Sequence, residues 1–336
     1  MVIGLLAMLA MSFLGSACFR RYALAKKILD IPNERSAHEL PTPRGGGIVF
    51  AACFLFTLPL LLKVYSLNPI VILTLMVSGT LITFTGFLDD YYDLSAALRL
   101  LAHFSLSGIS VYMMGGVPDL PLFYNYSLPA WFGSGLFVIY LVWLLNLYNF
   151  MDGIDGIASI EAISVCLVMA LVYTLNHQIA MAYLPLWLFS SVTGFLFWNF
   201  PKARLFMGDS GSSFLGFIFG LFSLLAIQIN PDLFACWLIM LALFVTDATV
   251  TLLQRLYSGE PVFQAHSSHA YQHAARYFSR HLPVSLLVLV INLLYLMPIA
   301  LATGLGYIHS VYGLILAYMP LGILVYFLNA GRAHKL

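Results

Sequence analysis

Hydrophobic segments long enough to cross a lipid bilayer recur along the whole chain. A helix needs roughly 20 mostly apolar residues to cross about 30 Å of hydrocarbon. Of the 336 residues, 61% are hydrophobic and only 9% are charged, whereas a soluble domain carries about 25% charged residues. We therefore expect an all-α fold, a polytopic integral membrane protein that forms a single membrane-embedded domain over residues 1–336. Its transmembrane helices, about eleven in number, are expected at residues 2–19, 47–64, 69–88, 99–114, 134–151, 157–175, 180–198, 212–229, 233–253, 283–303 and 312–329.

The basic residues gather in the loops on one side of the expected membrane. Thirteen of the 15 Lys and Arg residues fall on that side, in residues 20–46, 89–98, 152–156, 199–211, 254–282 and 330–336. The positive-inside rule makes this side cytoplasmic, which places the N-terminus outside and the C-terminus in the cytoplasm. The first segment lacks the basic stretch that precedes the apolar part of a signal peptide, so we expect a retained first span.

Most of the aspartates fall on the same side. Asp119 and Asp232 lie on the outer side, and Asp247 lies within the ninth span. Six lie at cytoplasmic span ends or in short cytoplasmic loops: Asp89, Asp90, Asp93, Asp152, Asp155 and Asp209. An ion-coupled transporter tends to keep ionisable residues near the midplane of the membrane. This distribution instead favours chemistry at the cytoplasmic surface on a membrane-embedded substrate.

The segment FLDDYYDLSAALR (87–99) ends the third expected span. Asp89 and Asp93 are four residues apart and are expected on one helical face. Neighbouring carboxylates repel one another unless a cation lies among them. Mg²⁺ held by one or two carboxylates and by substrate phosphates would suit this cluster. The alternative is a solvated helix end in which Asp93 pairs with Arg99.

The segment WNFPKARLFMGDSGSSFLG (198–216) enters the eighth expected span through a Gly/Ser turn. Asp209 is expected just before the helix, with Ser210, Ser212 and Ser213 as candidate N-caps. Free N–H groups at a helix start favour an anion, and an adjacent Asp can hold a metal against a phosphate. The alternative is that Asp209 is only a helix cap.

The segment HSSHAYQHAARYFSRH (266–281) is the most polar part of the chain. We expect a helix on which His266, His269, His273, Arg276 and Arg280 form one stripe. Facing a cleft, such a stripe would stabilise a diphosphate and a departing nucleotide phosphate. Two alternatives stay open. One is a zinc site, for which no fourth ligand is evident, and the other is a basic helix lying on anionic lipid.

Two further segments lie on the cytoplasmic side. Pro and Gly keep DIPNERSAHELPTPRGGG (30–47) from forming a helix, and it carries His38 and Arg44 as a substrate-gripping loop would. Its three glycines resemble a phosphate cradle only weakly. NFMDGIDG (149–156) would expose an Asn and two carboxylates that can recognise a nucleobase or ribose by hydrogen bonds. The alternative for this segment is a polar helix end and turn.

Together, these five segments resemble the polyprenyl-phosphate N-acetylhexosamine-1-phosphate transferases, which form glycosyl transferase family 4. The matching pieces are PNERSAHELPTPRGGG, GFLDDYYDL, NLYNFMDGIDG, WNFPKARLFMGDSGSSFLG and the histidine segment. The resemblance implies transfer of an N-acetylhexosamine-1-phosphate from a UDP-sugar to undecaprenyl phosphate, with release of UMP. It also implies Mg²⁺ as cofactor, with Mn²⁺ as an alternative, and a cytoplasmic-face active site in the bacterial inner membrane. The bilayer is then a partner and nucleic acid is not; a homodimer stays open.

The resemblance implies roles for individual residues. Asp89 and Asp90 would lie beside the metal as a general base or as handlers of the lipid phosphate. Asp209 would be the metal ligand, with Asp89 as a second candidate. The substrate-binding residues would be His38, Asn149, Asp152, Asp155, Asn199, Phe206, His266, His269, His273 and Arg276. A phosphate monoester has a second pKa of about 6, so the acceptor is mostly dianionic at pH 7 and Asp89 need not remove a proton.

The histidine segment departs from the family pattern, in which the last cytoplasmic loop carries adjacent histidines. Its three spread histidines resemble the branch that starts O-antigen, capsule and related lipopolysaccharide polymers with amino sugars. The alternatives are the phospho-N-acetylmuramoyl-pentapeptide transferase of peptidoglycan synthesis, a non-enzymatic lipid or solute transporter, and a catalytically inactive homologue. These residues do not determine the sugar, the polymer or the oligomeric state.

Overall fold

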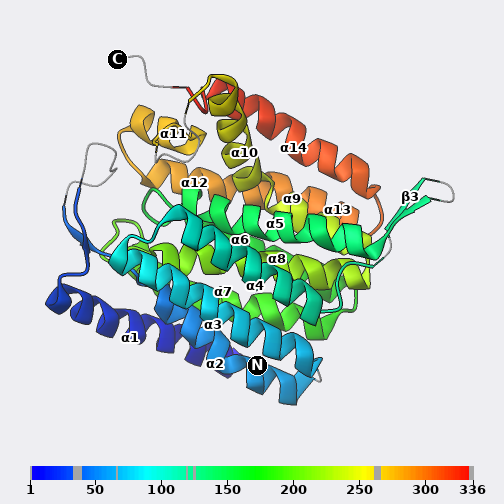
Figure 1. The fold of residues 1–336 in the computed structure, drawn as a ribbon, viewed down its shortest axis with the longest axis horizontal. Helices are drawn as coiled ribbons and strands as arrows, with labels where there is room; N and C mark the ends of the chain where they lie inside the picture. Colours follow the sequence, from blue (N-terminus) through cyan, green and yellow to red (C-terminus); the bar gives the residue numbers. More distant parts are fainter. Residues whose placement is uncertain are drawn as a thin grey trace.

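The computed structural model is nearly all helical (Figure 1). It describes residues 2–32, 40–65, 67–118, 120–123, 126–260 and 266–332. The helices are α1 (Val2–Lys26), α2 (Gly47–Tyr65), α3 (Pro69–Tyr92), α4 (Ala96–Met113), α5 (Ala130–Met151), α6 (Ile157–Leu175), α7 (Ile179–Asn199), α8 (Asp209–Ile229), α9 (Pro231–Met240), α10 (Ala242–Tyr257), α11 (Ala270–Phe278), α12 (Leu282–Val290), α13 (Met297–Gly304) and α14 (Ser310–Phe327). A π-helix, η1 (Ile291–Leu296), joins α12 to α13. Four short strands complete the structure: β1 (Leu29–Asp30), β2 (Thr42–Pro43), β3 (Leu120–Phe123) and β4 (Tyr126–Leu128).

Every expected apolar segment coincides with a helix or with consecutive helices. Within the described part of the chain, nine helical segments are long and apolar enough to cross a membrane, or ten if the bent pair α9–α10 counts as one span. The helix α2 is apolar but shorter. The expectation of a polytopic helical membrane protein is therefore confirmed. The count of eleven spans and the orientation remain predictions.

The ninth expected span, residues 233–253, is not one straight helix. It breaks at Leu241, where α9 and α10 meet at 66°, and Figure 1 shows α10 crossing the direction of the other helices. A carboxylate within a membrane-spanning segment is costly unless polar groups surround it. The bend accompanies contacts between Asp247 and the start of α11.

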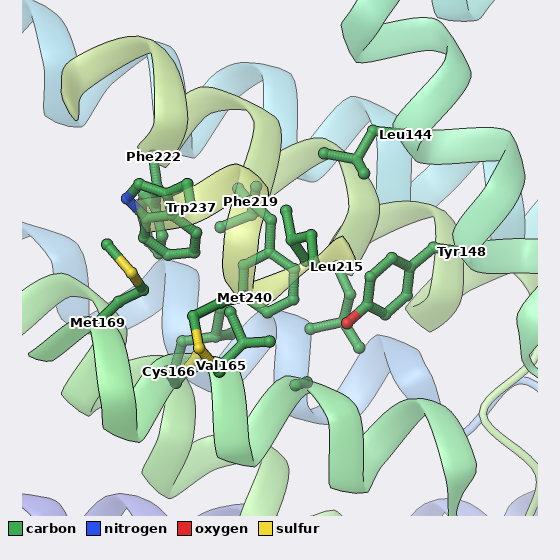
Figure 2. Close-up of a cluster of buried hydrophobic side chains, with 14 of the residues drawn as sticks. Leu144, Tyr148, Val165, Cys166, Met169, Leu215, Phe219, Phe222, Trp237 and Met240 are labelled. Atoms are coloured by element: carbon green, nitrogen blue, oxygen red, sulfur yellow. The ribbon is translucent and has the colours of Figure 1, made fainter. Parts of the chain in front are cut away.

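The core forms around α8, which is the most deeply buried of the long helices. Figure 2 shows side chains of α5, α6, α8 and α9 packed together, including Tyr148, Cys166, Phe219 and Trp237. A buried polar contact also joins helices: Asn292 of η1 donates to the carboxyl group of Glu161 in α6 over 2.6 Å. Glu161 is fully buried. This contact lies outside the acidic cluster that the sequence predicted.

The polar parts of the chain lie at one end of the helices. The C-terminal ends of α3, α5 and α7, the N-terminal end of α8, the turn before α6 and the residue before α12 all line the same cavity or its neighbour. Figure 1 shows this end at the left, beside α11, while β3 lies at the right. The antiparallel pair β1–β2, with Leu29 opposite Pro43, brings Asp30 and Arg44 to the polar end. The core thus fixes several helix ends around one place.

Candidate active site

Two neighbouring cavities occupy the polar end. Cavity A has a volume of about 270 Å³ and cavity B about 330 Å³. Cavity A is lined by Asp30, Arg44, Asp90, Asn149, Asp152, Gly153, Ile154, Asp155, Asn199, Phe206, Met207, Gly208, Asp209, Ser212, Gln272 and His281. Cavity B is lined by Arg44, Asp89, Asp90, Asp93, Leu94, Arg99, Asn149 and Asp209. The cavities share Arg44, Asp90, Asn149 and Asp209, so a ligand in one meets the same charged groups as a ligand in the other.

Asp90 caps the start of α8. One carboxylate oxygen accepts the N–H of Asp209 over 2.9 Å, and the other accepts the N–H of Ser210 over 3.1 Å. Gly208 turns the chain with φ +72°, and a side chain there would collide with the carboxylate of Asp90. The serines expected as caps do not fill that role, since α8 begins at Asp209 itself and its cap comes from α3. The alternative that Asp209 is only a cap is therefore wrong.

Asp89 and Asp209 form a second arrangement with Arg99. Nη1 of Arg99 lies 2.5 Å from Oδ2 of Asp89 and 3.4 Å from Oδ2 of Asp209. The two carboxyl groups are within hydrogen-bonding reach of each other, and the side chain of Asn149 bonds Asp209. Asp89 also accepts the N–H of Leu94, which holds its side chain against the turn after α3. One guanidinium thus contacts both carboxyl groups at the wall of cavity B.

The expectation that Asp89 and Asp93 share a helical face is wrong. The helix α3 ends at Tyr92, and Asp93 follows it in the left-handed conformation with φ +49°. Its side chain is 87% exposed and pairs with Arg44 over 3.5 Å. The alternative pairing of Asp93 with Arg99 is likewise wrong, because Arg99 contacts Asp89 and Asp209 instead.

A divalent cation at these cavities would need ligand atoms from side chains, waters or substrate. No group of three or more His, Cys, Asp and Glu side chains that could hold a metal occurs in the part of the chain that the structure describes. The three-histidine zinc alternative is therefore not formed there. Mg²⁺ needs fewer protein ligands, because it keeps several waters and is usually bound by one or two carboxylates and substrate phosphates. The adjacent carboxylates of Asp89 and Asp209 fit that requirement.

The turn 149–156 lies in cavity A, as expected for a binding segment. Burial, and then the nearby carboxylates of Asp90 and Asp155, raise the pKa of Asp152 well above its usual range. Asp155 is held differently: His281 approaches its carboxylate at 3.0 Å, and Ser285 donates to its carbonyl over 2.7 Å. The two aspartates of this turn therefore have different surroundings.

Tyr271 holds the same turn from the side of α11. Its hydroxyl donates to the carbonyl of Phe150 over 3.0 Å. A side chain at Gly153 would collide with that hydroxyl, so the close packing requires glycine there. Burial, and then Asp247 and Asp152, raise the pKa of Tyr271 well above its usual range. The hydroxyl therefore keeps its proton and its hydrogen bond throughout the physiological pH range.

Asn199 and Phe206 also line cavity A, as predicted. The side chain of Asn199 accepts from Ser159 over 3.1 Å and donates to the carbonyl of Leu205 over 3.2 Å, which fixes its orientation. The amide of Gly46 donates to the carbonyl of Phe206, and that of Gly47 donates to the carbonyl of the residue after it. Those two amides are thus engaged by the 206–207 segment, which removes the weak indication of a phosphate cradle there.

The predicted stripe of the histidine segment is wrong in its geometry. The helix α11 covers only Ala270–Phe278, so His266 and His269 precede it and Arg280 follows it. The reason is a tertiary contact: the carboxylate of Asp247 accepts the N–H of Ala270 and Tyr271 over 2.9 Å each and contacts the ring of His269. This carboxylate starts the helix at 270.

The predicted binding residues of this segment do not line either cavity in the described structure. His266 stacks on His269 at 4.9 Å, and Arg276 donates to the carbonyl of Ser267. Arg276 also contacts His273 over 3.2 Å. Burial, and then His269 and Arg255, lower the pKa of His266 to about 4, so His266 is neutral near pH 7. These side chains organise the segment around α11.

Other side chains reach the cavities in their place. Gln272 and His281 line cavity A, and Arg99 lines cavity B. Gln272 is three residues after His269 and accepts its N–H over 3.1 Å in a capping box. The three-residue spacing from His269 to Gln272 was available as a signal for that cap. Nothing in the order of residues indicated that Arg99 would reach Asp209, which is 110 residues later. His38 lies outside the described residues.

The fold and the site together define a class: a multi-pass membrane protein with a polar site at one end of its helices, in which arginine side chains pair with aspartates. Comparison with known proteins places it further. The family model for glycosyl transferase family 4 matches residues 72–227. The chain is 30% identical over 235 residues to a phospho-N-acetylmuramoyl-pentapeptide-transferase of Petrotoga mobilis, covering 63% of this chain and 68% of that protein. The chain belongs to glycosyl transferase family 4.

Two further relatives are phosphotransferases by name. A probable undecaprenyl-phosphate N-acetylglucosaminyl 1-phosphate transferase of Bacillus subtilis is 27% identical over 286 residues, covering 82% of this chain and 77% of the relative. A decaprenyl-phosphate N-acetylglucosaminephosphotransferase of Mycobacterium leprae is 28% identical over 293 residues, covering 76% of this chain and 72% of the relative. The resemblance predicted from the five segments is confirmed.

Proposed function

We propose that this protein transfers an N-acetylhexosamine-1-phosphate from a UDP-sugar to undecaprenyl phosphate or a similar polyprenyl phosphate. The reaction would take place at the cytoplasmic face of the bacterial inner membrane. An oxygen of the acceptor phosphate attacks the phosphorus that carries the sugar, and a new P–O bond forms. The bond from that phosphorus to the oxygen shared with the α-phosphate breaks, so UMP leaves and the sugar remains on a lipid diphosphate.

The joining of cavities A and B at Asp209 is the observation that carries this proposal. Cavity A contains Asn149, Asp152, Asn199 and Phe206, the hydrogen-bonding and aromatic groups that suit a uridine. Cavity B lies where α3 ends and α4 begins and holds the carboxylates and the arginine of the phosphate chemistry. A soluble donor and a lipid acceptor could therefore meet at one wall.

The residues at that wall would act by position and charge. Asp89 and Asp209 would hold Mg²⁺, which supplies charge neutralisation to the diphosphate when it is bound. Arg44 borders both cavities and can approach phosphate oxygens from either. Asp90 supports the site by fixing the backbone of Asp209. Since the acceptor phosphate is already mostly dianionic at neutral pH, we assign no proton removal to Asp89.

The relatives' names favour N-acetylglucosamine as the first sugar to test, and the spread histidines favour an O-antigen or capsule role. The peptidoglycan reaction is the second candidate, because the Petrotoga mobilis relative carries that name. The assay uses purified protein with undecaprenyl phosphate, Mg²⁺ and one radiolabelled donor at a time. The donors are UDP-GlcNAc, UDP-GalNAc, UDP-FucNAc, UDP-QuiNAc and UDP-MurNAc-pentapeptide. Lipid-linked label and UMP are both measured.

Variants test the assignment within the same assay. We expect Asp209→Asn and Asp89→Asn to lower turnover by at least about 100-fold, the loss typical of removing a group that stabilises transition-state charge. Asp232→Asn is the matched control, because Asp232 contacts Ser310 away from both cavities and should keep activity within about twofold. Near-normal turnover by Asp209→Asn, or UMP release with none of the donors, would contradict the proposed function.

A further inference from the structure

Arg99 contacts the two carboxylates that the proposed function assigns to a divalent cation. Its Nη1 is 2.5 Å from Oδ2 of Asp89 and 3.4 Å from Oδ2 of Asp209. The side chain of Arg99 is 38% exposed, whereas that of Asp89 is only 7% exposed. The carboxylate is therefore fixed, while the guanidinium borders an open cavity into which it can move.

We propose that Arg99 is an exchangeable internal counter-ion. It pairs with the carboxyl groups of Asp89 and Asp209 until a divalent cation replaces it there, and the released guanidinium then binds the phosphate of the lipid acceptor. This inference rests on the proposed function, because it concerns the order in which the same site takes up its cation and its acceptor.

The contact distances imply that Arg99 and a divalent cation compete for the same carboxylate oxygens. A Mg²⁺ ion lies about 2.0–2.1 Å from its oxygen ligands. An ion on Oδ2 of Asp89 would thus lie at most about 4.6 Å from Nη1 of Arg99 in its present position, by adding the ligand distance to the observed contact. Like charges at that separation oppose one another strongly in a partly buried site. Arg99 must leave these oxygens for the ion to bind well.

The place of Arg99 in the fold indicates where the guanidinium goes. It lies in the first turn of α4, four residues after the N-cap Ser95, at the wall of cavity B. The same helix exposes Leu98, Leu101 and Phe104, an apolar surface that suits contact with lipid chains. An acceptor whose chain lies beside α4 would bring its phosphate to Arg99. A guanidinium binds phosphate through two parallel hydrogen bonds, which an ammonium group cannot do.

The proposal predicts opposite effects of one substitution on two ligands. Mn²⁺ binding to the purified protein is measured without substrates by electron paramagnetic resonance. We expect Arg99→Gln to bind Mn²⁺ at least about fivefold more tightly than the wild type, since the competing cation is gone. Binding of farnesyl phosphate in the presence of Mn²⁺ should weaken by at least about fivefold in the same variant. Arg99→Met, a second neutral variant, should behave like Arg99→Gln.

Two controls separate direct competition from a general change in charge. Arg44→Gln removes the same charge from the same cavity, but Arg44 pairs with Asp93. Its effect on Mn²⁺ affinity should be clearly smaller than that of Arg99→Gln. Arg99→Lys retains the charge and should keep Mn²⁺ affinity within about twofold of the wild type while weakening farnesyl phosphate binding.

The outcomes distinguish this inference from the proposed function. Unchanged or weaker Mn²⁺ binding in both neutral variants would overturn it, and so would unchanged farnesyl phosphate binding. Neither measurement needs turnover. If the binding results are as expected but no UDP-sugar is used, the counter-ion exchange stands and the transferase assignment fails. If transfer occurs but Mn²⁺ affinity is unaffected by Arg99, the transferase assignment stands and the exchange fails.

Discussion

Replacing Asp90 by asparagine tests whether this carboxylate mainly supports the site or takes part in its chemistry. Both oxygens of Asp90 accept backbone N–H groups at the start of α8, and the residue is only 3% exposed. The negative charge is also favourable beside a helix N-terminus. In Asp90→Asn, one oxygen can still accept, but the amide group faces the other N–H and cannot accept from it. One charge-assisted hydrogen bond is therefore lost and a buried donor is left unpaired.

The magnitude follows from that single lost bond. A hydrogen bond to a charged group contributes about 1.5–3 kcal/mol to stability. In domains of 150–250 residues, 1 kcal/mol shifts the melting temperature by about 2–4 °C, and longer chains shift less. For this protein we expect Asp90→Asn to lower the melting temperature by about 3–6 °C. Activity should fall in parallel, because the start of α8 carries Asp209.

The assay is thermal unfolding of purified protein in detergent at neutral pH, beside the transferase assay. Asp93→Asn is the matched control: Asp93 is 87% exposed and its ion pair with Arg44 is 3.5 Å long. An exposed pair of this kind contributes about 0–1 kcal/mol, so the control should melt close to the wild type. If Asp90→Asn melted with the control while turnover was abolished, Asp90 would act in the chemistry and the capping argument would be wrong.

Substitutions at three other positions test other parts of the structure. The raised pKa of Asp152 means that the folded protein retains a proton that the unfolded chain releases above its ordinary pKa of 3.8. The stability of the wild type therefore falls as pH rises above that value. Asp152→Asn lacks this dependence, so its melting temperature should exceed that of the wild type between about pH 5 and 8. A gain that does not grow with pH would contradict this. Tyr271→Phe removes the hydrogen bond to the carbonyl of Phe150, which contributes about 0.5–1.5 kcal/mol. This substitution should raise the KM for the UDP-sugar about 2–10-fold with little change in kcat. An unchanged KM would refute a role for this hydrogen bond in donor binding. Glu161→Gln preserves an acceptor for Asn292 and should melt near the wild type. Glu161→Leu removes one of the two acceptors of that amide and leaves Ser164 as the other, so it should cost about 0.5–1.5 kcal/mol; equal melting of the two variants would count against the contact.

Much of the fold was predictable because membrane insertion depends on local hydropathy. Every expected apolar segment is helical, and the segments that carry Asp90, Asn149 and Asp209 do meet at one end. Their meeting follows from topology, since a chain that crosses the membrane repeatedly returns its alternate helix ends to the same side. The family resemblance depended partly on the same segments, which lie within the residues 72–227 that the family model matches.

The failures share a cause, which is that tertiary contacts decided the local structure. The helix α11 starts at Ala270 because Asp247, 23 residues earlier, accepts its first N–H groups. The helical period alone predicted a longer helix with a different face. Asp93 leaves the helix and pairs with Arg44, which comes from the loop before α2. Both partners, Asp247 and Arg44, are remote in the chain from the motifs they contact, so no spacing within either motif could reveal these contacts.

The aspartates at the polar end differ chemically because their carboxylates contact different groups. Asp90 is compensated by backbone N–H groups of α8, which cannot leave without unfolding the helix start. Asp155 meets the ring of His281 within the wall of cavity A. Asp89 and Asp209 instead share the side chain of Arg99.

That difference separates the aspartates that build the site from those that can change partners. A carboxylate compensated by backbone is fixed in charge and place, and it serves as a support. A carboxylate compensated by a long, partly exposed side chain can exchange that cation for another without unfolding any helix. Of the aspartates that line cavity B, Asp89 and Asp209 are paired in this way with Arg99. Asp89 and Asp90 are adjacent in the chain but have different partners in the structure, which make Asp90 a support and, under the proposed exchange, make Asp89 the carboxylate that changes its partner.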